Sequence, residues 1–408
     1  MRNKISQFIS RHPLVAKYFL LQFFLGMHFI GAVTLPFFTD WGGLSFAQVM
    51  ILQSWFSFWV FTLEVPTGVV ADYLSRKASI SLGALVCAVA ALTYGLYPNF
   101  YLFLLAEFLW AIGFALQSGA SEAWFYDSLA EKKQQSQAKK FIGQAHSFFL
   151  GGMMMAATLG GVIAQQFGLN VPILFQAGTF FLAFLFSLTF KEPQIDTQPS
   201  ESKRLLEIAR QGIKQVRHNR LVRLIMLDTV IVALAAYYVL WFEQAVLQKV
   251  GVALQWFGLV HALMLLAEIA VSSQFEWFDR QLERFSISYR QLSAALTGLG
   301  FFLALIPSPW TAVLFILLSG GFGLTRIKYL SAQLNHVIDS KQRATVLSFL
   351  SMLRRMVIMI VNPVFGWLVE LNFNLALILV GLLPFFVFLL PSSPALPLSS
   401  NKTKIDNN

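Results

Sequence analysis

Long apolar stretches, separated by short polar ones, follow one another along the whole chain. Each is close to the roughly 20 residues that a helix needs to cross a bilayer. We place twelve of them, at 16–37, 46–70, 79–97, 101–126, 142–166, 172–190, 221–246, 255–275, 291–307, 310–330, 345–369 and 374–391. The pattern predicts an all-α membrane protein with twelve transmembrane helices.

The composition excludes a soluble protein and most cofactor chemistry. Of the 408 residues, 57% are hydrophobic and 12% are charged, whereas soluble proteins carry about 25% charged residues. The single cysteine, Cys87, excludes an internal disulfide framework and a cysteine-based metal site. The six histidines show no metal-ligand spacing. We therefore expect no cofactor and no metal.

The net charge of +10 is spread in a way that indicates topology. The odd-numbered connections between spans contain one basic residue, Lys249. The even-numbered connections hold the rest: Arg76–Lys77, Lys132–Lys133, Lys139–Lys140, several within 191–223, Arg280, Arg284, Arg290, Lys341 and Arg343. Lysine and arginine accumulate in cytoplasmic loops. We expect both termini in the cytoplasm, a multi-pass protein of the inner or plasma membrane, and no nucleic-acid partner.

The longest connection divides the predicted spans into two groups of six. It predicts an N-terminal six-helix bundle at 1–190, a cytoplasmic linker at 191–220 and a C-terminal bundle at 221–391. Within the linker, Leu205, Ala209, Ile213 and Val216 recur at helical spacing among basic residues, which is typical of a helix on a membrane surface. The tail, 392–408, is polar and rich in serine and proline, so we expect it to be disordered.

Weak internal matches suggest that the two bundles are repeats. Gly68-x-x-x-Asp72 has a counterpart in Phe275-x-x-x-Asp279, "IGF" at 112–114 in "GGF" at 320–322, and "AATLGG" at 156–161 in "NPVFGW" at 362–367. The matches keep one order and nearly one spacing. Two repeated halves with a binding site between them are typical of secondary transporters.

The loop after the second span resembles the signature loop of the major facilitator superfamily. The residues are Gly68-x-x-x-Asp72-x-x-x-Arg76-Lys77, with Tyr73 and Ser75 where the family has an arginine and a second glycine. "EVPTG" at 64–68 and "SGASEAWFYDSL" at 118–129 are similar to a bacterial branch of that family. The resemblance implies two pseudo-symmetric six-helix bundles that expose a central site alternately to the two sides of the membrane.

The resemblance also implies a cytoplasmic latch. Asp72, after Gly68, would meet the start of the eleventh span near Arg343, because an anion is favoured at a helix N-terminus. Arg76 and Lys77 would reach Glu122 and Asp127. The alternative is that these charges only anchor the loop in the cytoplasm.

At two positions the sequence differs from the pattern of the proton-coupled exporters in the family that it resembles. Their arginine in the fourth helix is replaced by Glu107, and the proline of their fifth helix is absent from Gly152-x-x-x-Ala156-Ala157-x-x-Gly160-Gly161. The small residues of that run still permit close helix packing. Exporter function therefore does not follow from the resemblance alone.

Among the charged residues inside predicted spans, seven are the candidates for function: Glu64, Glu107, Asp228, Glu268, Arg326, Arg354 and Arg355. Each costs at least about 2.5–3.5 kcal/mol to insert, so each is a candidate for function. Glu64 would pair with Arg354 or Arg355 across the two halves in one access state. Alternatively, Glu268 would pair with one of these arginines as a static ion pair.

Glu107 and Asp228 would lie in the central cavity and bind a proton or a cationic group; the alternative is that they reach water near a helix end. His28 and His146 are expected to be packing residues.

No nucleotide-binding loop, nucleophile elbow, metal set or dinucleotide fingerprint occurs in the sequence. We therefore expect no enzyme and no ATP hydrolysis. The hypothesis is a monomeric secondary transporter in the lipid bilayer, an antiporter that couples efflux of a small amphipathic molecule to protons or another cation. Uptake of a nutrient or siderophore is the second hypothesis, and a non-transporting receptor or scaffold is the third.

Overall fold

The computed structural model describes the backbone of residues 12–193, 210, 212–214, 217, 220–338 and 340–390. Side chains are described for the same residues except 64–74, 221, 335–337 and 340–344. Most of the predicted amphipathic linker helix and all of the tail that was predicted to be disordered lie outside the described residues, so both stay predictions. The described part is helical and contains no strand.

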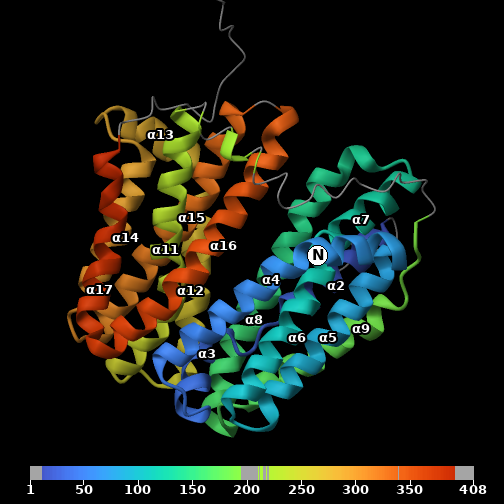
Figure 1. The fold of residues 1–408 in the computed structure, drawn as a ribbon, viewed down its shortest axis with the longest axis horizontal. Helices are drawn as coiled ribbons and strands as arrows, with labels where there is room; N and C mark the ends of the chain where they lie inside the picture. The colour runs from blue at the N-terminus through green and yellow to red at the C-terminus, as the bar shows by residue number, and fades with distance from the viewer. Residues whose placement is uncertain are drawn as a thin grey trace, which may run out of the picture. The chain divides into compact units, whose positions relative to one another are not determined.

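The twelve spans predicted from the hydrophobic pattern are present as helical segments (Figure 1). The first six are α2 (Pro13–Gly26) continued by η1 (Gly31–Val33), α3 (Thr34–Pro36) and η2 (Phe37–Trp41); α4 (Phe46–Leu74); α5 (Arg76–Leu96); α6 (Phe100–Gln117) continued by α7 (Ala120–Glu131); α8 (Ala138–Phe167) with η3 (Gln135–Gln137) before it; and α9 (Val171–Ser187).

The other six are α11 (Arg220–Lys249), α12 (Leu254–Ser272), α14 (Tyr289–Leu303), α15 (Pro309–Val337), α16 (Ser340–Leu371), and α17 (Phe373–Leu382) continued by η4 (Leu383–Leu389). A short helix, α13 (Phe275–Glu283), lies between α12 and α14. Among the described residues, nine segments are long and apolar enough to cross a membrane by themselves.

The helices begin where the sequence supplies capping residues. Ser45 and Gln48 form a capping box at the start of α4, and Ser288 and Gln291 form another at α14. At α6, the side chain of Asn99 accepts hydrogen bonds from the first-turn amides. Such caps satisfy backbone donors that a helix start leaves unpaired. They fix the short turns between neighbouring spans.

Contacts within the chain define two compact units. Unit 1 comprises Met1–Arg204, Ala253–Ala262 and Met359–Gly366, and unit 2 comprises Leu205–Val252, Leu263–Ile358 and Trp367–Asn408. In unit 1, α5 packs between α6 and α9, and α2 packs on α8 (Figure 1). In unit 2, α15 packs on α11 and α14.

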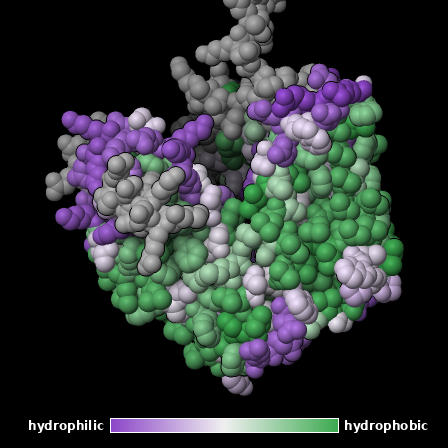
Figure 2. All heavy atoms as spheres, turned by 180° about the vertical axis from the view of Figure 1, so that it is seen from behind, coloured by the Kyte–Doolittle hydropathy of each residue, from purple (hydrophilic) through white to green (hydrophobic). Residues whose placement is uncertain are grey.

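The surface fits a bilayer environment. On the face drawn in Figure 2, apolar residues cover the sides of the helices and hydrophilic residues gather towards their ends. Many large apolar side chains are exposed, among them Leu92, Leu182, Leu263 and Leu314. Exposed apolar area of this extent is unusual in a soluble monomer. The chain is a multi-span helical membrane protein.

Two of the twelve spans are not continuous helices, which the sequence pattern did not reveal. The first span is interrupted between Gly26 and Gly31, and the fourth between Gln117 and Ala120. A β-carbon at Gly26 would overlap the backbone of Phe149 on α8, so glycine permits a close approach there. Gly119 has φ of +78°, a conformation that glycine adopts without strain. Both interruptions belong to unit 1.

Candidate functional site

Two cavities in unit 1 lie at these interruptions. One has a volume of about 320 Å³ and the other of about 380 Å³. They share four lining residues, which are Gln22, Gln117, Ser118 and Ser121. Two of these, Ser118 and Ser121, flank Gly119 at the break between α6 and α7. Because irregular backbone at membrane depth is tolerated where it lines a cavity, the breaks make this place a candidate binding site.

The smaller cavity is mainly apolar and aromatic. Besides the shared residues it is lined by Leu25, His28, Phe56, Cys87, Trp110, Phe114, Phe149 and Phe180. The ring of His28 meets those of Phe180 and Trp110 edge-on, with centroids 5.6 Å and 6.0 Å away. Such surroundings bind aromatic or aliphatic groups by burying their apolar area.

The larger cavity is more polar. Tyr18, Gly119, Glu122, Ile142, Ala145 and His146 line it in addition to the shared residues. Glu122 is the only residue with a formal charge at neutral pH among the described residues that line either cavity. An apolar cavity and a polar cavity with a common wall together suit a molecule with one apolar and one polar end.

Hydrogen bonds hold the shared wall in place. Nε2 of Gln22 donates to Oγ of Ser121 over 3.0 Å, and that hydroxyl donates to the phenol oxygen of Tyr18 over 3.4 Å. Nε2 of Gln117 donates to the carbonyl of Gly113 over 3.3 Å and lies 3.5 Å from Sγ of Cys87. Both amide groups are thereby fixed in orientation.

The interruption after α2 is stabilised by α9. The side-chain oxygen of Gln176 accepts a hydrogen bond from the amide of Ile30 over 3.3 Å, and Thr179 donates to the carbonyl of Met27 over 3.4 Å. These bonds replace helical ones that the break removes. His28 lies in the break, and its ring is thereby presented to the apolar cavity.

Most residues of these cavities do not stand out in the sequence. Gln22 and Gln117 were passed over because neither is charged, although an amide in an apolar run is itself a signal. His28 and His146 were expected to pack, and both line cavities. Glu122 was expected within reach of Arg76 and Lys77, and it lines the larger cavity.

Part of the expected latch is brought together in unit 1. Arg76, at the start of α5, forms an ion pair with Asp127 on α7 and donates to the carbonyl of Ala123 over 2.9 Å. The side chains of Asp72 and Arg343 lie outside the described residues, and Gly68 has no side chain. Their part in the latch stays a prediction.

The structure adds Glu192 to this region. Its two carboxylate oxygens accept hydrogen bonds from the backbone amides of Arg76 and Lys77, over 2.9 Å and 2.8 Å. Ser75 has φ of +105°, a conformation that glycine adopts more readily than serine, and its hydroxyl accepts from the amide of Ala78. The first turn of α5 is thus capped by a residue more than 100 positions away.

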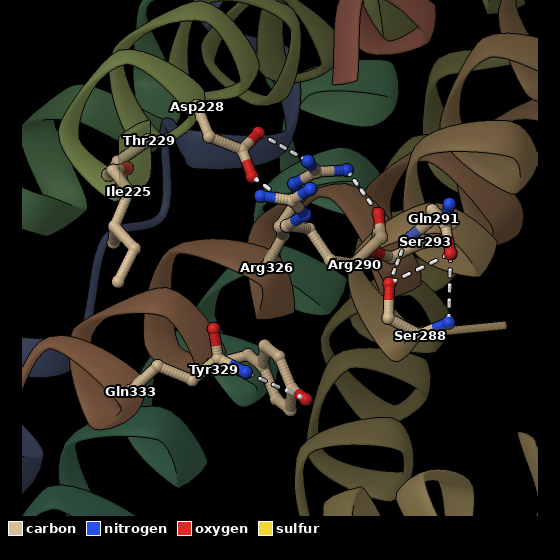
Figure 3. Close-up of polar contacts among 10 residues, drawn as sticks. All are labelled: Ile225, Asp228, Thr229, Ser288, Arg290, Gln291, Ser293, Arg326, Tyr329 and Gln333. Carbon is tan, nitrogen blue, oxygen red and sulfur yellow. Dashed lines mark hydrogen bonds and ion pairs between the residues drawn. The ribbon is translucent and has the colours of Figure 1, made fainter. Parts of the chain in front are cut away.

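Unit 2 contains a buried charge cluster (Figure 3). Asp228 on α11 is 1% exposed and forms an ion pair with Arg326 on α15, which is fully buried. Nε of Arg290, on α14, lies 3.6 Å from the other carboxylate oxygen. The guanidinium of Arg326 also donates to the backbone carbonyl of Arg290 over 2.6 Å. Three spans are tied together at one carboxylate.

The prediction that Arg290 lies in a loop is wrong, and the charge cluster that contains it extends towards α13. Arg290 was counted among loop residues and is 5% exposed, inside the fold. Next to Arg326, Thr325 shares a hydrogen bond with Tyr289. Tyr329 donates to Asp279 on α13 over 2.7 Å. Partial burial raises the pKa of Asp279 above its ordinary value, and the hydrogen bond from Tyr329 opposes this rise in pKa.

Glu107 has a different environment. It is 5% exposed and accepts a hydrogen bond from Nε2 of Gln53 on α4 over 2.8 Å; it also interacts with Tyr94. No basic side chain forms an ion pair with it among the described residues. Glu107 does not line either of the two cavities described in unit 1.

The remaining charged candidates lie on α12 and α16. Glu268 forms an ion pair of 2.7 Å with Lys328, a partner that the sequence analysis did not consider. Arg354 and Arg355 are half-buried on α16. The side chain of Glu64 lies outside the described residues, so its pairing with either arginine stays a prediction.

Comparisons with known proteins agree with the helical architecture. The sequence model of the Major Facilitator Superfamily matches residues 18–359. The multidrug resistance protein MdtG of Enterobacter lignolyticus is 27% identical over 198 residues, which is 48% of this chain and 43% of that protein. MdtG of Citrobacter koseri is 25% identical over 198 residues, 48% of this chain and 44% of that protein. The matched stretch therefore spans less than half of these relatives.

Solved structures resemble the chain over nearly its full length. The nucleoside transporter NupG has a TM-score of 0.77 at 15% identity, with 93% of this chain and 100% of that chain covered. A bacterial homologue of the human lysosomal transporter Spinster has a TM-score of 0.72 at 16% identity, with 93% and 97% covered. At this identity the likeness concerns the fold.

Proposed function

We propose that this chain, which belongs to the Major Facilitator Superfamily, exports small amphipathic molecules by alternating access. Membership of that family makes it a transport protein and not an enzyme. The observation that carries the proposal is the cavity pair in unit 1, where an aromatic cavity and a polar one share the wall made by Gln22, Gln117, Ser118 and Ser121. The partial similarity to MdtG, named as a multidrug resistance protein, supports the same direction of transport.

The proposed energy source is a proton gradient, with Glu107 as the proton-binding residue. Asp228 is less suited, because its charge is committed to Arg326 and Arg290. Glu107 has only neutral partners among the described residues, Gln53 and Tyr94. A carboxyl group in such surroundings can gain and lose a proton without breaking an ion pair. Substrate and proton would each shift the same two-state equilibrium, which couples them.

The proposal includes the arrangement in the membrane. The excess of lysine and arginine in the even-numbered connections supports cytoplasmic termini and a place in the inner or plasma membrane. The halves at 1–190 and 221–391 would rock about the linker, as a monomer. The pair of Arg76 and Asp127, with Asp72 and Arg343, would hold the cytoplasmic side closed.

Inside-out membrane vesicles test direction and coupling together. When respiration acidifies the lumen, an exporting antiporter accumulates a fluorescent amphipathic dye there, and a protonophore abolishes the accumulation. Glu107→Gln is expected to lose this accumulation and to keep exchange of dye across the membrane without a gradient. Glu131→Gln, an exposed carboxylate at the end of α7, is the matched control and is expected to behave as the wild type.

Accumulation only in right-side-out vesicles would replace export by uptake. If transport occurred in both vesicle types and the protonophore did not change it, proton coupling would be refuted. If Glu107→Gln kept full gradient-driven accumulation, another residue would have to carry the proton.

A further inference from the structure

We infer that the cavity pair of unit 1 selects organic cations that carry both an aromatic ring and N–H donors, that is, protonated aromatic amines. This inference rests on the proposed function, because it takes the cavities to be the substrate site. It adds the sign of the charge and the hydrogen-bonding character of the cargo, which amphipathic character alone leaves open.

The hydrogen bonds of the shared wall occupy the amide NH₂ groups of two lining residues and leave their amide oxygens without a described donor. The NH₂ groups of Gln22 and Gln117 are used in bonds to Ser121 and to Gly113. No described residue donates to Oε1 of either amide. An amide whose donors are taken offers its oxygen, with two lone pairs, to whatever enters. A ligand that donates hydrogen bonds is therefore favoured over one that only accepts them.

The charge of the residues that line the cavities also favours a protonated amine. Glu122 contributes the one formal charge among the described lining residues, and no lysine or arginine is among them. Glu122 lines the polar cavity together with Gln22 and Gln117. A charged acceptor gives a hydrogen bond about twice as strong as a neutral one. An anionic ligand would meet the carboxylate without a compensating cation.

The aromatic cavity supplies the second recognition element. The rings of Trp110 and Phe180 lie at 5.3 Å in an edge-to-face arrangement, with His28 and Phe149 beside them. Such rings gain from edge and face contacts with another ring, and tryptophan attracts a nearby cation over its face. An aromatic group in this cavity would place an amine on a short chain against the wall of acceptors.

The experiment uses probes that differ only at the polar end. Naphthyl-ethylamine, its trimethylammonium analogue and naphthyl-propionate share one ring system and carry, in turn, a donor-bearing cation, a cation without donors and an anion. Binding to the purified full chain is measured by calorimetry at pH 8, which is above the ordinary pKa of histidine. The expected order is amine, then quaternary ammonium, then carboxylate, with about tenfold or more between the first and last.

Glu122→Gln separates the charge from the rest of the site. It is expected to weaken amine binding by about threefold to tenfold, as for a partly exposed ion pair, and to leave the carboxylate unchanged or bound more tightly. The control is Glu131→Gln on the same helix, which does not line the cavities and should bind like the wild type. Both side chains are exposed, so both variants should fold.

Equal affinity for amine and carboxylate in the wild type would overturn the inference, as would an unchanged preference in Glu122→Gln. A quaternary ammonium that binds as tightly as the amine would remove the role of the amide oxygens. None of these outcomes would change the conclusion that the vesicle assay gives about export. Conversely, a clear preference for the amine without accumulation in either vesicle type would count against transport and leave the inference on recognition standing.

Discussion

Replacing Asp228 by asparagine should destabilise unit 2 more than any other single change in its charge cluster. The carboxylate is shared by two guanidinium groups, those of Arg326 and Arg290 (Figure 3). Removing it leaves both cations in a buried place without their common anion. Removing Arg326 instead leaves Asp228 with Arg290, at 3.6 Å. The two ends of the same ion pair are therefore not equivalent.

The burial of the pair gives the magnitude. Asp228 is 1% exposed and Arg326 is fully buried, so neither charge is compensated by water. Breaking a buried pair by removing one partner costs about 3–5 kcal/mol. For Asp228→Asn we expect the unfolding free energy to fall by about 3–5 kcal/mol. For Arg326→Met we expect a smaller fall, about 1–3 kcal/mol. The double variant should be more stable than Asp228→Asn alone, because one stranded cation is gone.

The assay is thermal unfolding of the purified protein in detergent, followed by circular dichroism. For a unit of this size, the loss in Asp228→Asn corresponds to a fall in Tm of roughly 6–20 °C. The matched control is Lys328→Gln, two residues from Arg326 on the same helix. Lys328 pairs with Glu268 but is 46% exposed, so its loss should cost at most about 1 kcal/mol.

Equal effects of Asp228→Asn and Arg326→Met would show that Arg290 does not share the carboxylate. Additive effects in the double variant would show that the two side chains do not interact. A Lys328→Gln variant as unstable as Asp228→Asn would refute the dependence on burial.

Three further outcomes are expected. Glu192→Gln weakens the cap on the amides of Arg76 and Lys77 and should lower stability by about 0.5–1 kcal/mol, measured as Tm and compared with wild type at high salt, where the difference shrinks. Gly119→Ala meets no neighbouring atom but places a β-carbon at φ of +78°, so it should cost about 1–2 kcal/mol and weaken ligand binding measured by calorimetry. The raised pKa of Asp279 means that its ionised form costs stability at neutral pH; Asp279→Asn should therefore exceed the wild type in Tm there, and the gap should close as the pH falls through the raised pKa towards the unfolded value.

The hydrophobic pattern predicted the twelve spans because insertion in a bilayer depends on the total apolarity of about 20 consecutive residues. It did not predict the interruptions at Gly26–Gly31 and Gln117–Ala120, because these depend on neighbours in space. The break after α2 needs the close approach of α8 at Gly26 and the side chains of Gln176 and Thr179 on α9. None of these is near in sequence.

The sequence was sufficient to select charged candidate residues but not to predict their interaction partners. Asp228, Arg326 and Glu107 stand out in apolar runs, and the cost of inserting them makes any one a candidate. Their partners come from other spans: 98 positions separate Asp228 from Arg326, and 54 separate Glu107 from Gln53. Glu192 lies at the end of the described first half, in a polar stretch where nothing in the sequence connects it with α5.

The two units place different chemistry at corresponding positions of the proposed repeat. Gln22 on α2 and Ser121 on α7 are hydrogen-bonded in unit 1, and Asp228 on α11 and Arg326 on α15 are ion-paired in unit 2. Asp228 follows Gln22 by 206 positions and Arg326 follows Ser121 by 205, close to the spacing of the repeated motifs.

A neutral pair can exchange a hydrogen bond with an incoming ligand at little cost, whereas a buried ion pair cannot open without stranding charge. On this reasoning the first-half pair is suited to binding cargo, and its counterpart in the second half to keeping α11, α14 and α15 together while cargo binds and leaves.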